Sequence, residues 1–496
     1  MSLLLGIDIG TSSAKGVLVD ADGTVVARAD RAHDTSTPRP GWVEHDAETV
    51  WWADFRHLAS ELLRAADGRE IAGLCVSGIG PVLLPADADG NPLRPAILYG
   101  VDTRAGAEIE ELNAEFGAGA IMDRGGTPLS SQAVGPKLRW LAKHEPQVWD
   151  RTRMLLMASS FVVHRLTGEY VLDHHSASQC DPLYDRRTRD WATDWAQTVA
   201  PGLPLPRLAW PSEVVGTVSA RAAAETGLPQ GLPVCAGTVD AWAESVSVGV
   251  SRPGETMVMY GTTMFLINVA DDPTPHPGLW TTCGAMPGTY SLAAGMATSG
   301  AITDWLRRLV GGDFAELVAA AATVPPGSRG LLLLPYFAGE RTPIFDPDAR
   351  GVIAGLTLQH GPAELYRAAL EGIAHGVRHN LEVMRDAGGA IDRLVAVGGG
   401  TQGGLWTQIV SDVTGEAQDI PARTMGACLG DAMLAATGVG IDADFGKWNP
   451  VEYTVRPDPA RAETYEAFHQ RYRRLYPATA DVAHFLAARQ IAASAD

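Results

Sequence analysis

The chain opens with apolar runs separated by turn residues, a pattern that predicts a β-meander. An apolar run begins at Leu3, the turn Gly10-Thr11-Ser12-Ser13 interrupts it, and a second run covers Lys15 to Val19. The turn Asp20 to Gly23 then precedes a third run, Thr24 to Arg28. Short runs bounded by Gly, Asp and Ser are typical of strands joined by hairpins. We expect three strands whose first turn is rich in small hydroxyl residues.

Part of this pattern recurs near the middle of the chain. Thr256 to Tyr260 resembles a strand, Gly261-Thr262-Thr263 forms a turn, and Met264 to Val269 resembles a second strand. The shared strand-turn-strand plan indicates a duplicated architecture with one copy in each half.

Helical periodicity is clearest over Ala363 to Ala387, where apolar residues recur at three- or four-residue spacing. Gly361-Pro362 precedes this segment and Gly388-Gly389 follows it, which are typical start and stop signals of a helix. We expect further helices over Glu48 to Ala66 and Leu138 to His144.

Two further segments are distinctive. Leu394 to Val397 predicts a short strand, and the glycine turn Gly398-Gly399-Gly400 follows it. The Pro-rich passage from Pro201 to Pro211 predicts an irregular surface loop or an insertion.

Length divides this pattern into two domains, because 496 residues exceed what one hydrophobic core usually supports. We expect an α/β protein whose N-terminal domain covers residues 1–245 and whose C-terminal domain covers residues 246–496, with a catalytic cleft between them. Hydrophobic residues at 46% and charged residues at 20% are ordinary for a folded protein.

The formal net charge of −19 argues against nucleic acid and anionic lipid as partners. No stretch approaches the roughly 18 apolar residues of a membrane span. The cysteines are scattered and odd in number, which predicts neither a disulfide framework nor a zinc site and fits a reducing cytoplasm. They are Cys75, Cys180, Cys235, Cys283 and Cys428.

The first turn, Gly10 to Ser13, offers unhindered backbone N–H groups and hydroxyls, which are suited to cradling phosphate oxygens. An isolated turn of this kind is usually an ordinary hairpin. Its recurrence at Gly261-Thr262-Thr263 favours a nucleotide site.

Two carboxylates belong with these turns. Asp8 interrupts an apolar strand two residues before the first turn, where an unpaired carboxylate would be costly to bury. It either faces a cation or accepts hydrogen bonds from loop N–H groups. Asp240 lies between the two turns in sequence. Its carboxylate could accept the proton of a substrate hydroxyl, or it could be the N-cap of a helix.

Other motifs exclude other enzymes. Gly398-Gly399-Gly400 lacks the G-x-G-x-x-G spacing of a dinucleotide site, and the chain contains no P-loop. Ser12-Ser13 lacks the G-x-S-x-G elbow of a hydrolase. Asp173-His174-His175 offers metal-ligand chemistry, but adjacent loop histidines are usually surface residues.

With these residues placed, the chain resembles the FGGY family of carbohydrate kinases over nearly its whole length. The most specific match is Gly351 to Leu356 followed, after seven residues, by Glu364 to Glu371. Further matches to the family pattern are Gly6 to Ser12, Pro40 to Asp46, Pro136 to Trp140, Gly261 to Thr263, and Gly398 to Gly400 with Leu405-Trp406.

This resemblance implies the two-domain actin-like, ribonuclease-H-like fold with ATP and Mg²⁺ as cofactors. It places Asp240 as general base and Asp8 beside the magnesium ion. Gly10, Thr11, Ser12, Ser13, Gly261, Thr262 and Thr263 would hold phosphates. Gly398, Gly399 and Gly400 would approach the adenosine, and Gly426 and Ala427 the adenine.

Within the family, length and motif layout resemble the xylulose kinases most. Gly80, Pro81, Tyr99, Asp102 and Arg104, with Asp240, occupy the sugar-site positions. Pro81 stands where many xylulose kinases carry a sugar-contacting histidine, and the segment from Tyr99 to Arg104 is one residue longer than usual. An Asp102–Arg104 pair that is purely structural is the alternative.

The resemblance therefore implies ATP-dependent phosphorylation of a primary hydroxyl on a small ketose, D-xylulose first. The alternatives are other sugar or polyol acceptors, namely L-xylulose, ribulose, gluconate, erythritol or glycerol. A catalytically silent actin-like nucleotide-binding module is the rival from another class. A cytoplasmic homodimer is the family-level expectation.

Overall fold

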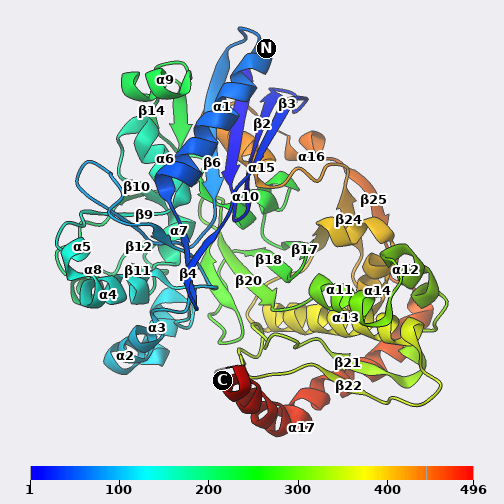
Figure 1. Cartoon of the computed structure of the whole chain (residues 1–496). Coiled ribbons are helices and arrows are strands. Elements are labelled where there is room, and N and C mark those ends of the chain that lie inside the picture. The colour runs from blue at the N-terminus through cyan, green and yellow to red at the C-terminus, as the bar shows by residue number, and fades with distance from the viewer. Residues whose placement is uncertain (1, 443, 495–496) are drawn as a thin grey trace. The chain divides into compact units, whose positions relative to one another are not determined.

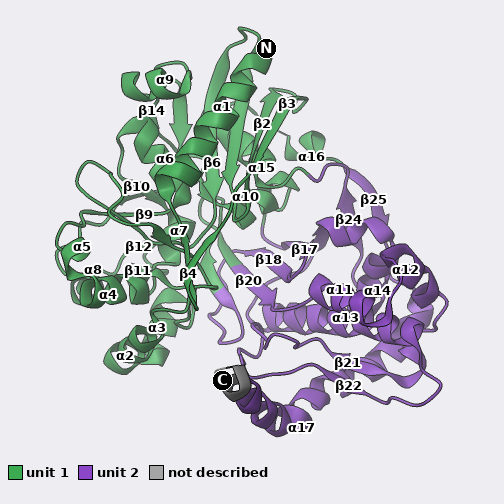
Figure 2. Ribbon diagram, in the orientation of Figure 1, with its two compact units in different colours: residues 1–252, 281–291, 425–450 green, residues 253–280, 292–424, 451–496 purple. Residues whose placement is uncertain are grey.

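The computed structural model describes residues 2–442 and 444–494, which pack into two compact units (Figure 2). Unit 1 combines the chain up to Arg252 with Thr281–Ser291 and Met425–Pro450. Unit 2 comprises Pro253–Trp280, Leu292–Thr424 and the chain from Val451 onward. The expected division into an N-terminal domain of residues 1–245 and a C-terminal domain of residues 246–496 stays a prediction.

Unit 1 begins with the predicted β-meander, which is confirmed. Strands β1 (Leu3–Ile9), β2 (Ser13–Asp20) and β3 (Val25–Ala32) pair antiparallel (Figure 1). Asp8 lies opposite Lys15 in the register of β1 and β2. Because the turn between these strands is only three residues long, Gly10 to Ser12 lie directly beyond the sheet edge.

Parallel strands extend this sheet on the other side of β1. The order is β14 (Val214–Thr217), β15 (Pro233–Cys235), β6 (Ile71–Gly78), β1, β2, β3, and the short strand β16 (Thr238–Val239) also pairs with β6. Strands β1, β6 and β16 are parallel to one another. Their carboxyl ends therefore meet at one edge, where α/β proteins place their ligands.

Two helices cover the two faces of this sheet at very close range. Helix α15 (Ala427–Gly438) packs on Gly6, where an added Cβ would lie 2.0 Å from the Cys428 carbonyl oxygen. Helix α1 (Ala53–Ala66) packs on Gly16, where an added Cβ would lie 2.7 Å from Leu62 Cδ1. Because Gly16 pairs with Ile7 and neighbouring strand residues face opposite ways, the two helices lie on opposite faces.

Two sequence expectations for unit 1 need correction. The segment Glu48 to Ala66 is not one α-helix, since the π-helical turn η1 (Ala47–Trp52), capped by Asp46, precedes α1. His174 and His175 are not an exposed loop pair, because they begin helix α7 (His174–Ser178) and His175 is fully buried. The Pro-rich passage also contains strand β13 (Arg207–Ala209).

The remaining elements of unit 1 are short strands and helices around the sheet. The strands are β4 (Ser36–Arg39), β5 (Trp42–His45), β7 (Leu84–Ala86), β8 (Ala96–Ile97), β9 (Met154–Leu156), β10 (Val171–Asp173), β11 (Tyr184–Asp185) and β12 (Asp190–Trp191). The helices are α2 (Gly106–Phe116), α3 (Ala118–Gly125), α4 (Val134–His144), α5 (Pro146–Trp149), α6 (Ala158–Thr167), α8 (Thr193–Val199), α9 (Ala220–Thr226), α10 (Asp240–Ser247) and α16 (Phe445–Trp448).

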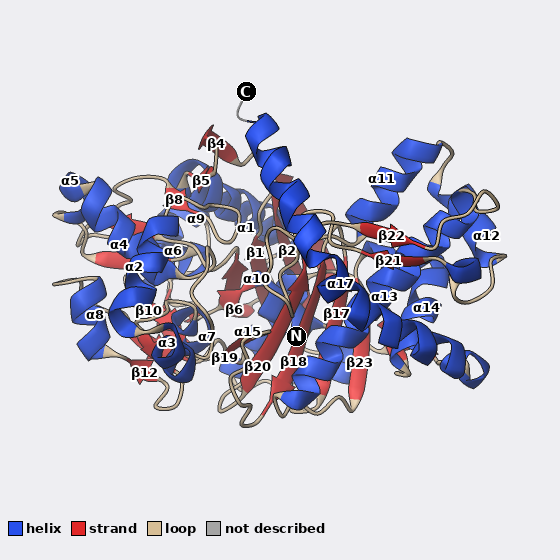
Figure 3. Cartoon of the chain, turned by 90° about the horizontal axis from the view of Figure 1, so that it is seen from below, coloured by secondary structure: helices blue, strands red, loops and turns tan. Residues whose placement is uncertain are grey.

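Unit 2 contains a second mixed sheet flanked by helices (Figure 3). Its strands run β19 (Trp280–Cys283), β20 (Tyr290–Met296), β18 (Met264–Ala270), β17 (Glu255–Tyr260), β23 (Arg393–Val397), β24 (Gln418–Pro421), β25 (Val451–Val455). The predicted hairpin of β17 and β18 and the predicted strand β23 are confirmed. Helix α13 (Pro362–Asp386) is also as predicted.

The other elements of the second half surround this sheet and helix. They are α11 (Gly300–Val310), α12 (Phe314–Ala322), η2 (Ser328–Gly330), β21 (Leu332–Leu334), β22 (Val352–Ala354), η3 (Gly399–Gly403), α14 (Leu405–Thr414), η4 (Pro459–Arg461) and α17 (Ala462–Ser494). Within the described part of the chain, no helix is both long and apolar enough to cross a bilayer.

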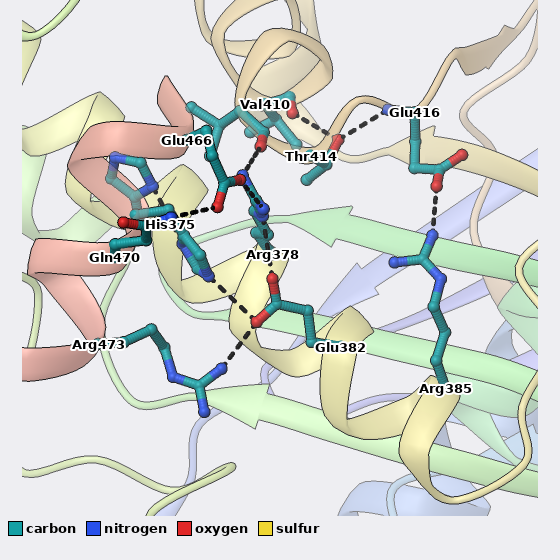
Figure 4. A network of polar contacts seen from close by, with 12 residues as sticks. His375, Arg378, Glu382, Arg385, Val410, Thr414, Glu416, Glu466, Gln470 and Arg473 are labelled. Atoms are coloured by element: carbon teal, nitrogen blue, oxygen red, sulfur yellow. Dashed lines mark hydrogen bonds and ion pairs between the residues drawn. The ribbon is translucent and has the colours of Figure 1, made fainter. Parts of the chain in front are cut away.

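A polar network fastens α17 to α13 in unit 2 (Figure 4). Glu382 of α13 accepts from Arg473 Nη1 at 2.7 Å and lies 3.1 Å from His469 Nε2, both on α17. Arg378 Nε donates to the other oxygen of Glu382 at 3.0 Å, and its Nη2 pairs with Glu466. Several charges share one network here, an arrangement that is more stabilising than isolated surface pairs.

Candidate functional site

The first phosphate turn, Gly10 to Ser13, is closed by the Gly10 N–H, which donates to the Ser13 carbonyl at 3.1 Å. Thr35 Oγ1 donates to the Thr11 carbonyl and the His33 N–H donates to the Ser12 carbonyl, each at 3.0 Å. The N–H groups of Thr11 and Ser12 donate to no partner in residues 2–442 and 444–494. Free N–H groups on a tight turn form an anion-binding concavity.

The second turn, Gly261 to Thr263 in unit 2, follows the same plan. The N–H of Gly300 donates to the Gly261 carbonyl at 3.0 Å, and the Ser299 N–H donates to the Thr262 carbonyl at 3.0 Å. Gly300 begins helix α11, and a Cβ added there would lie 2.6 Å from the Gly261 oxygen. The start of α11 therefore holds this turn from behind. The Gly261 N–H donates to the Thr263 carbonyl at 3.1 Å, and the Thr262 N–H, which has no partner among the described residues, is left for a ligand.

Asp8 belongs to a buried cluster of carboxyl groups in unit 1. The Ser77 hydroxyl lies 2.6 Å from Asp431 Oδ2 and 3.3 Å from Asp8 Oδ1, so one serine bridges two carboxyls. Asp431 Oδ1 is buried and finds no partner among the described residues. Buried carboxyls this close favour one shared proton or a bound cation over two free negative charges.

Desolvation raises the pKa values throughout this cluster. Burial raises the pKa of Asp8 to about 6, although nearby Lys15 opposes the shift. Burial and then the charge of Asp8 raise the pKa of Asp240 well above its ordinary value. The same two causes raise the pKa of Glu244 to about 7. Raised carboxyl pKa values in a concave site are typical of catalytic centres.

Asp240 begins helix α10 directly after β16, at the carboxyl edge shared by β1, β6 and β16. The N-cap residue is Val239, and among the described residues the Asp240 carboxylate accepts only from the adjacent Ala241 N–H, at 2.7 Å. An N-cap would instead bond the second or third N–H of the helix. The geometry therefore favours a functional carboxylate over the capping alternative.

Two residues expected at the sugar site, Gly80 and Tyr99, contact residues at the carboxyl ends of these strands. Gly80 lies against Val239, where an added Cβ would stand 2.6 Å from Val239 Cγ2, so a larger residue would press on the strand that carries Asp240. Tyr99 reaches the first phosphate turn, since its hydroxyl lies 3.3 Å from Thr11 Oγ1. These contacts place Gly80 at the end of β16 and Tyr99 beside the first turn, and Pro81 directly follows Gly80 in the chain.

Asp102 and Arg104 face inward and bond each other. Arg104 Nη2 lies 2.6 Å from Asp102 Oδ2, its Nη1 lies 2.9 Å from Glu44, and its guanidinium stacks 4.0 Å from the Trp42 ring centroid. Both side chains have no exposed surface. This geometry favours the structural alternative, in which the pair stabilises the segment from Tyr99 to Arg104.

The glycine-rich turn of unit 2 lies beside the second phosphate turn. Gly398 has φ = 94°, and an added Cβ there would meet the Tyr260 carbonyl oxygen at 2.5 Å. Tyr260 immediately precedes Gly261, so both turns lie at the carboxyl ends of the parallel strands β17 and β23. Glycine at 398 is required both by the left-handed backbone and by this close approach.

A cavity of about 890 Å³ opens next to this glycine turn. Gly403, Gly404 and Leu405 line one wall, and apolar residues of α12, including Val318, line another. This volume is in the range of small-molecule sites. Gly426 and Ala427 pack with unit 1 at the start of α15, so their approach to the adenine stays a prediction.

Asp8 and the carboxyl groups near it are the candidate residues for metal binding. Among the described residues no group of three or more His, Cys, Asp or Glu could hold an ion by itself. The orphaned oxygen of Asp431 and the surplus of carboxyls nevertheless fit a divalent cation that takes its other ligands from water and nucleotide phosphates. His175 has other partners, since its Nδ1 lies 2.8 Å from the Cys283 carbonyl oxygen and its ring stacks on Trp242.

Sequence reasoning missed Ser77, Glu244 and Asp431. Asp431 carried the same signal as Asp8, a single carboxylate inside an apolar segment, here Leu429 to Ala436. Glu244 lies one helical turn after Asp240, so a helix starting at 240 would have placed both carboxyls on one face. Ser77 carried no sequence signal, because only strand pairing brings it beside Asp8.

Comparison with known proteins decides the family. Residues 3–247 match the FGGY family of carbohydrate kinases, N-terminal domain, and residues 256–439 match the C-terminal domain of the same family. The chain belongs to the FGGY family of carbohydrate kinases. The resemblance inferred from the motifs is therefore confirmed.

Individual relatives cover this FGGY kinase almost completely. The xylulose kinase of Escherichia coli (strain K12) is 31% identical over 484 residues, covering 96% of this chain and 98% of that protein. The glycerol kinase of Nocardia farcinica is 32% identical, covering 96% and 99%. The crystal structure of xylulose kinase from Rhodospirillum rubrum superposes with a TM-score of 0.92 at 34% identity, covering 97% and 100%.

These matches also confirm the expected fold class. This kinase has the two-domain α/β, actin-like fold of the FGGY family. The residue roles inferred from that family are not tested by the matches and enter only as a proposal.

Proposed function

We propose that the protein transfers the γ-phosphoryl group of ATP to a primary hydroxyl of a small ketose, with D-xylulose as the first acceptor. The observation that carries this proposal is the position of Asp240. Its carboxylate does not cap helix α10 and lies at the carboxyl end of β16, near Asp8 and the first phosphate turn. The relatives from E. coli and R. rubrum are xylulose kinases, which supports xylulose as the acceptor.

In the proposed reaction the sugar hydroxyl oxygen attacks the γ-phosphorus as the bond to the leaving ADP oxygen breaks. Asp240 accepts the hydroxyl proton, and the free N–H groups of the turns at Gly10 and Gly261 hold phosphate oxygens. Both turns are pre-formed by bonds to their carbonyls, so their donors need no rearrangement when charge develops.

Asp8 would help to hold Mg²⁺ through the oxygen that does not face Ser77. The ion, when bound with the nucleotide, neutralises phosphate charge and thereby eases attack by the hydroxyl. The cavity beside Gly403 and Leu405 is proposed for the adenosine, next to Gly398, Gly399 and Gly400, with Gly426 and Ala427 near the adenine.

The acceptor pocket is proposed from Gly80, Pro81, Tyr99 and Asp240, with the pair Asp102–Arg104 shaping its wall. A polyol is the second candidate acceptor, because the glycerol kinase of N. farcinica matches this chain as well as the xylulose kinases do. Five buried free cysteines support a reducing cytoplasm, and the homodimer stays a prediction from the family.

The test is ADP release from magnesium-ATP over a panel of D-xylulose, L-xylulose, ribulose, gluconate, erythritol and glycerol, with a control that lacks acceptor. We expect D-xylulose to give the highest kcat/KM, and NMR of the product to place phosphate on the primary hydroxyl. A preference for glycerol or erythritol would reassign the acceptor. Silence across the panel with retained ATP binding would favour a nucleotide-binding module.

A further inference from the structure

A chain of polar side chains that has no role in the proposal above ends on the first phosphate turn. Trp51 Nε1 donates to His45 Nδ1 at 3.1 Å, His45 Nε2 lies 3.0 Å from Thr35 Oγ1, and Thr35 Oγ1 donates to the Thr11 carbonyl at 3.0 Å. Trp51 has no exposed surface and His45 is 1% exposed. The chain links the π-helical turn η1 and the end of β5 to the turn that we assign to phosphate.

The hydrogen atoms in this chain can be placed by elimination. An indole N–H can only donate, so His45 Nδ1 must accept and carries no proton. The neutral ring then has its proton on Nε2 and donates it to Thr35 Oγ1. The single hydroxyl hydrogen of Thr35 is thereby left for the Thr11 carbonyl, and every bond points from Trp51 towards the turn.

The surroundings of His45 keep this arrangement in place. Burial, and then the nearby His33, lower the pKa of His45 to about 4, so its ring is neutral at physiological pH. His33 is itself bound by Asp54, with 2.7 Å between Nδ1 and Oδ2, and Arg31 lies 3.2 Å from the other oxygen of that carboxylate. A hydrogen bond to the Thr11 backbone and the charge of Asp54 oppose the lowering of the His45 pKa without reversing it.

Anchoring the Thr11 carbonyl has a direct consequence for the next N–H group. The peptide unit is planar and trans, so its C=O and N–H point in opposite directions. When Thr35 holds the Thr11 oxygen, the Ser12 N–H must point to the other side of the turn. That N–H group has no partner among the described residues.

We propose that Thr35, oriented by His45 and Trp51, is a positioning residue that turns the Ser12 N–H towards the transferred phosphoryl group. The inference rests on the proposed kinase function and adds to it the residues that set the turn's donor geometry. In unit 2 the corresponding carbonyls are held by the N–H groups of Ser299 and Gly300, with a further bond of 3.1 Å from the Ser299 hydroxyl to the Gly261 carbonyl. In the first turn the Thr11 carbonyl is held instead by the Thr35 side chain.

The kinetic test is Thr35→Val, which removes the hydroxyl and keeps the branched shape. Loss of one orienting hydrogen bond, of order 1 kcal/mol, predicts a fall in kcat of about 5- to 10-fold, with KM for the sugar unchanged. Thr35→Ser should restore kcat to within about twofold, and Thr37→Val, on the exposed strand β4, should leave it unchanged. An unaltered kcat in Thr35→Val, with or without a lower Tm, overturns the proposal.

A second test reads the relay without turnover. In protein labelled with ¹⁵N-histidine, His45 is assigned by the signal lost in His45→Gln. We expect a neutral ring protonated on Nε2, and a shift of that N–H resonance in Thr35→Val. A ring protonated on Nδ1, or a resonance unmoved by Thr35→Val, refutes the relay. Absence of kinase activity in the wild type would instead refute the proposed function while this spectrum still judges the relay.

Discussion

Replacing Asp240 by Asn removes the proposed proton acceptor while keeping the size of the side chain. General-base catalysis typically contributes about 10²- to 10⁴-fold in rate, so we expect kcat to fall by that factor, or about 2.7 to 5.4 kcal/mol. The same change removes a charge that repels Asp8. One pKa unit of relieved repulsion is worth about 1.4 kcal/mol, which predicts a Tm that rises by a few degrees.

The assay pairs ADP release at saturating magnesium-ATP and D-xylulose with thermal unfolding of the same samples. Glu244→Gln is the matched control, because its carboxyl lies one turn further along α10 and its pKa is raised by burial and by Asp8 as well. It should raise Tm while changing kcat by less than about threefold. Full turnover in Asp240→Asn would refute the general base, and equal losses in both variants would assign the effect to the local electric field.

Three further outcomes follow from the same structure. Because burial and Asp8 raise the pKa of Asp240 and the base must be ionised, kcat/KM should fall as the pH is lowered, starting above the ordinary titration range of an aspartate. The residual rate of Asp240→Asn should lack this acid limb, and a flat wild-type profile would contradict the assignment. Burial raises the pKa of Glu340 to about 8, so the folded state holds this proton more tightly than the unfolded chain, and stability should decline as pH rises from about 4.5 to 8, by up to roughly 5 kcal/mol. Urea unfolding of Glu340→Gln should show a shallower decline, and identical slopes would exclude Glu340 as the source. A Cβ at Gly430 would lie 1.8 Å from the Ala243 carbonyl oxygen, so Gly430→Ala should destabilise unit 1 by about 1–3 kcal/mol and lower its Tm. An unchanged Tm would show that α15 can shift on α10.

Local pattern was sufficient where structure is set by neighbours in sequence. The meander β1 to β3 was legible because apolar runs alternate with Gly- and Asp-rich turns, and α13 because Gly361-Pro362 and Gly388-Gly389 bracket a regular apolar stripe. The π-helical turn at Ala47–Trp52 was not legible, since its apolar positions fit an α-helix equally well and its register is set by Asp46 and by packing.

The site was predictable only for residues adjacent to turns or alone in apolar segments. Asp8 and Asp240 met that condition. Thr35, His45 and Trp51 did not, because each looks like an ordinary residue of a polar connection or a helix start. Their meaning appears when β5 and η1 bring an indole, an imidazole and a hydroxyl into one line. Arg104 was ambiguous in sequence for the same reason, since burial against Trp42 is a tertiary property.

The division into two units has a consequence for exchanging parts between relatives. The chain leaves unit 1 after Arg252, returns for Thr281–Ser291, and returns again for Met425–Pro450, the segment that contributes α15. A fragment ending near residue 247 would lack α15 and would expose the backbone around Gly6, against which that helix packs at van der Waals contact. Chimeras joined between the two family domains would therefore combine the sheet of unit 1 from one parent with helix α15, which covers that sheet, from the other parent. Functional chimeras of this chain should therefore take the sheet of unit 1 and the segment that carries α15 from the same parent.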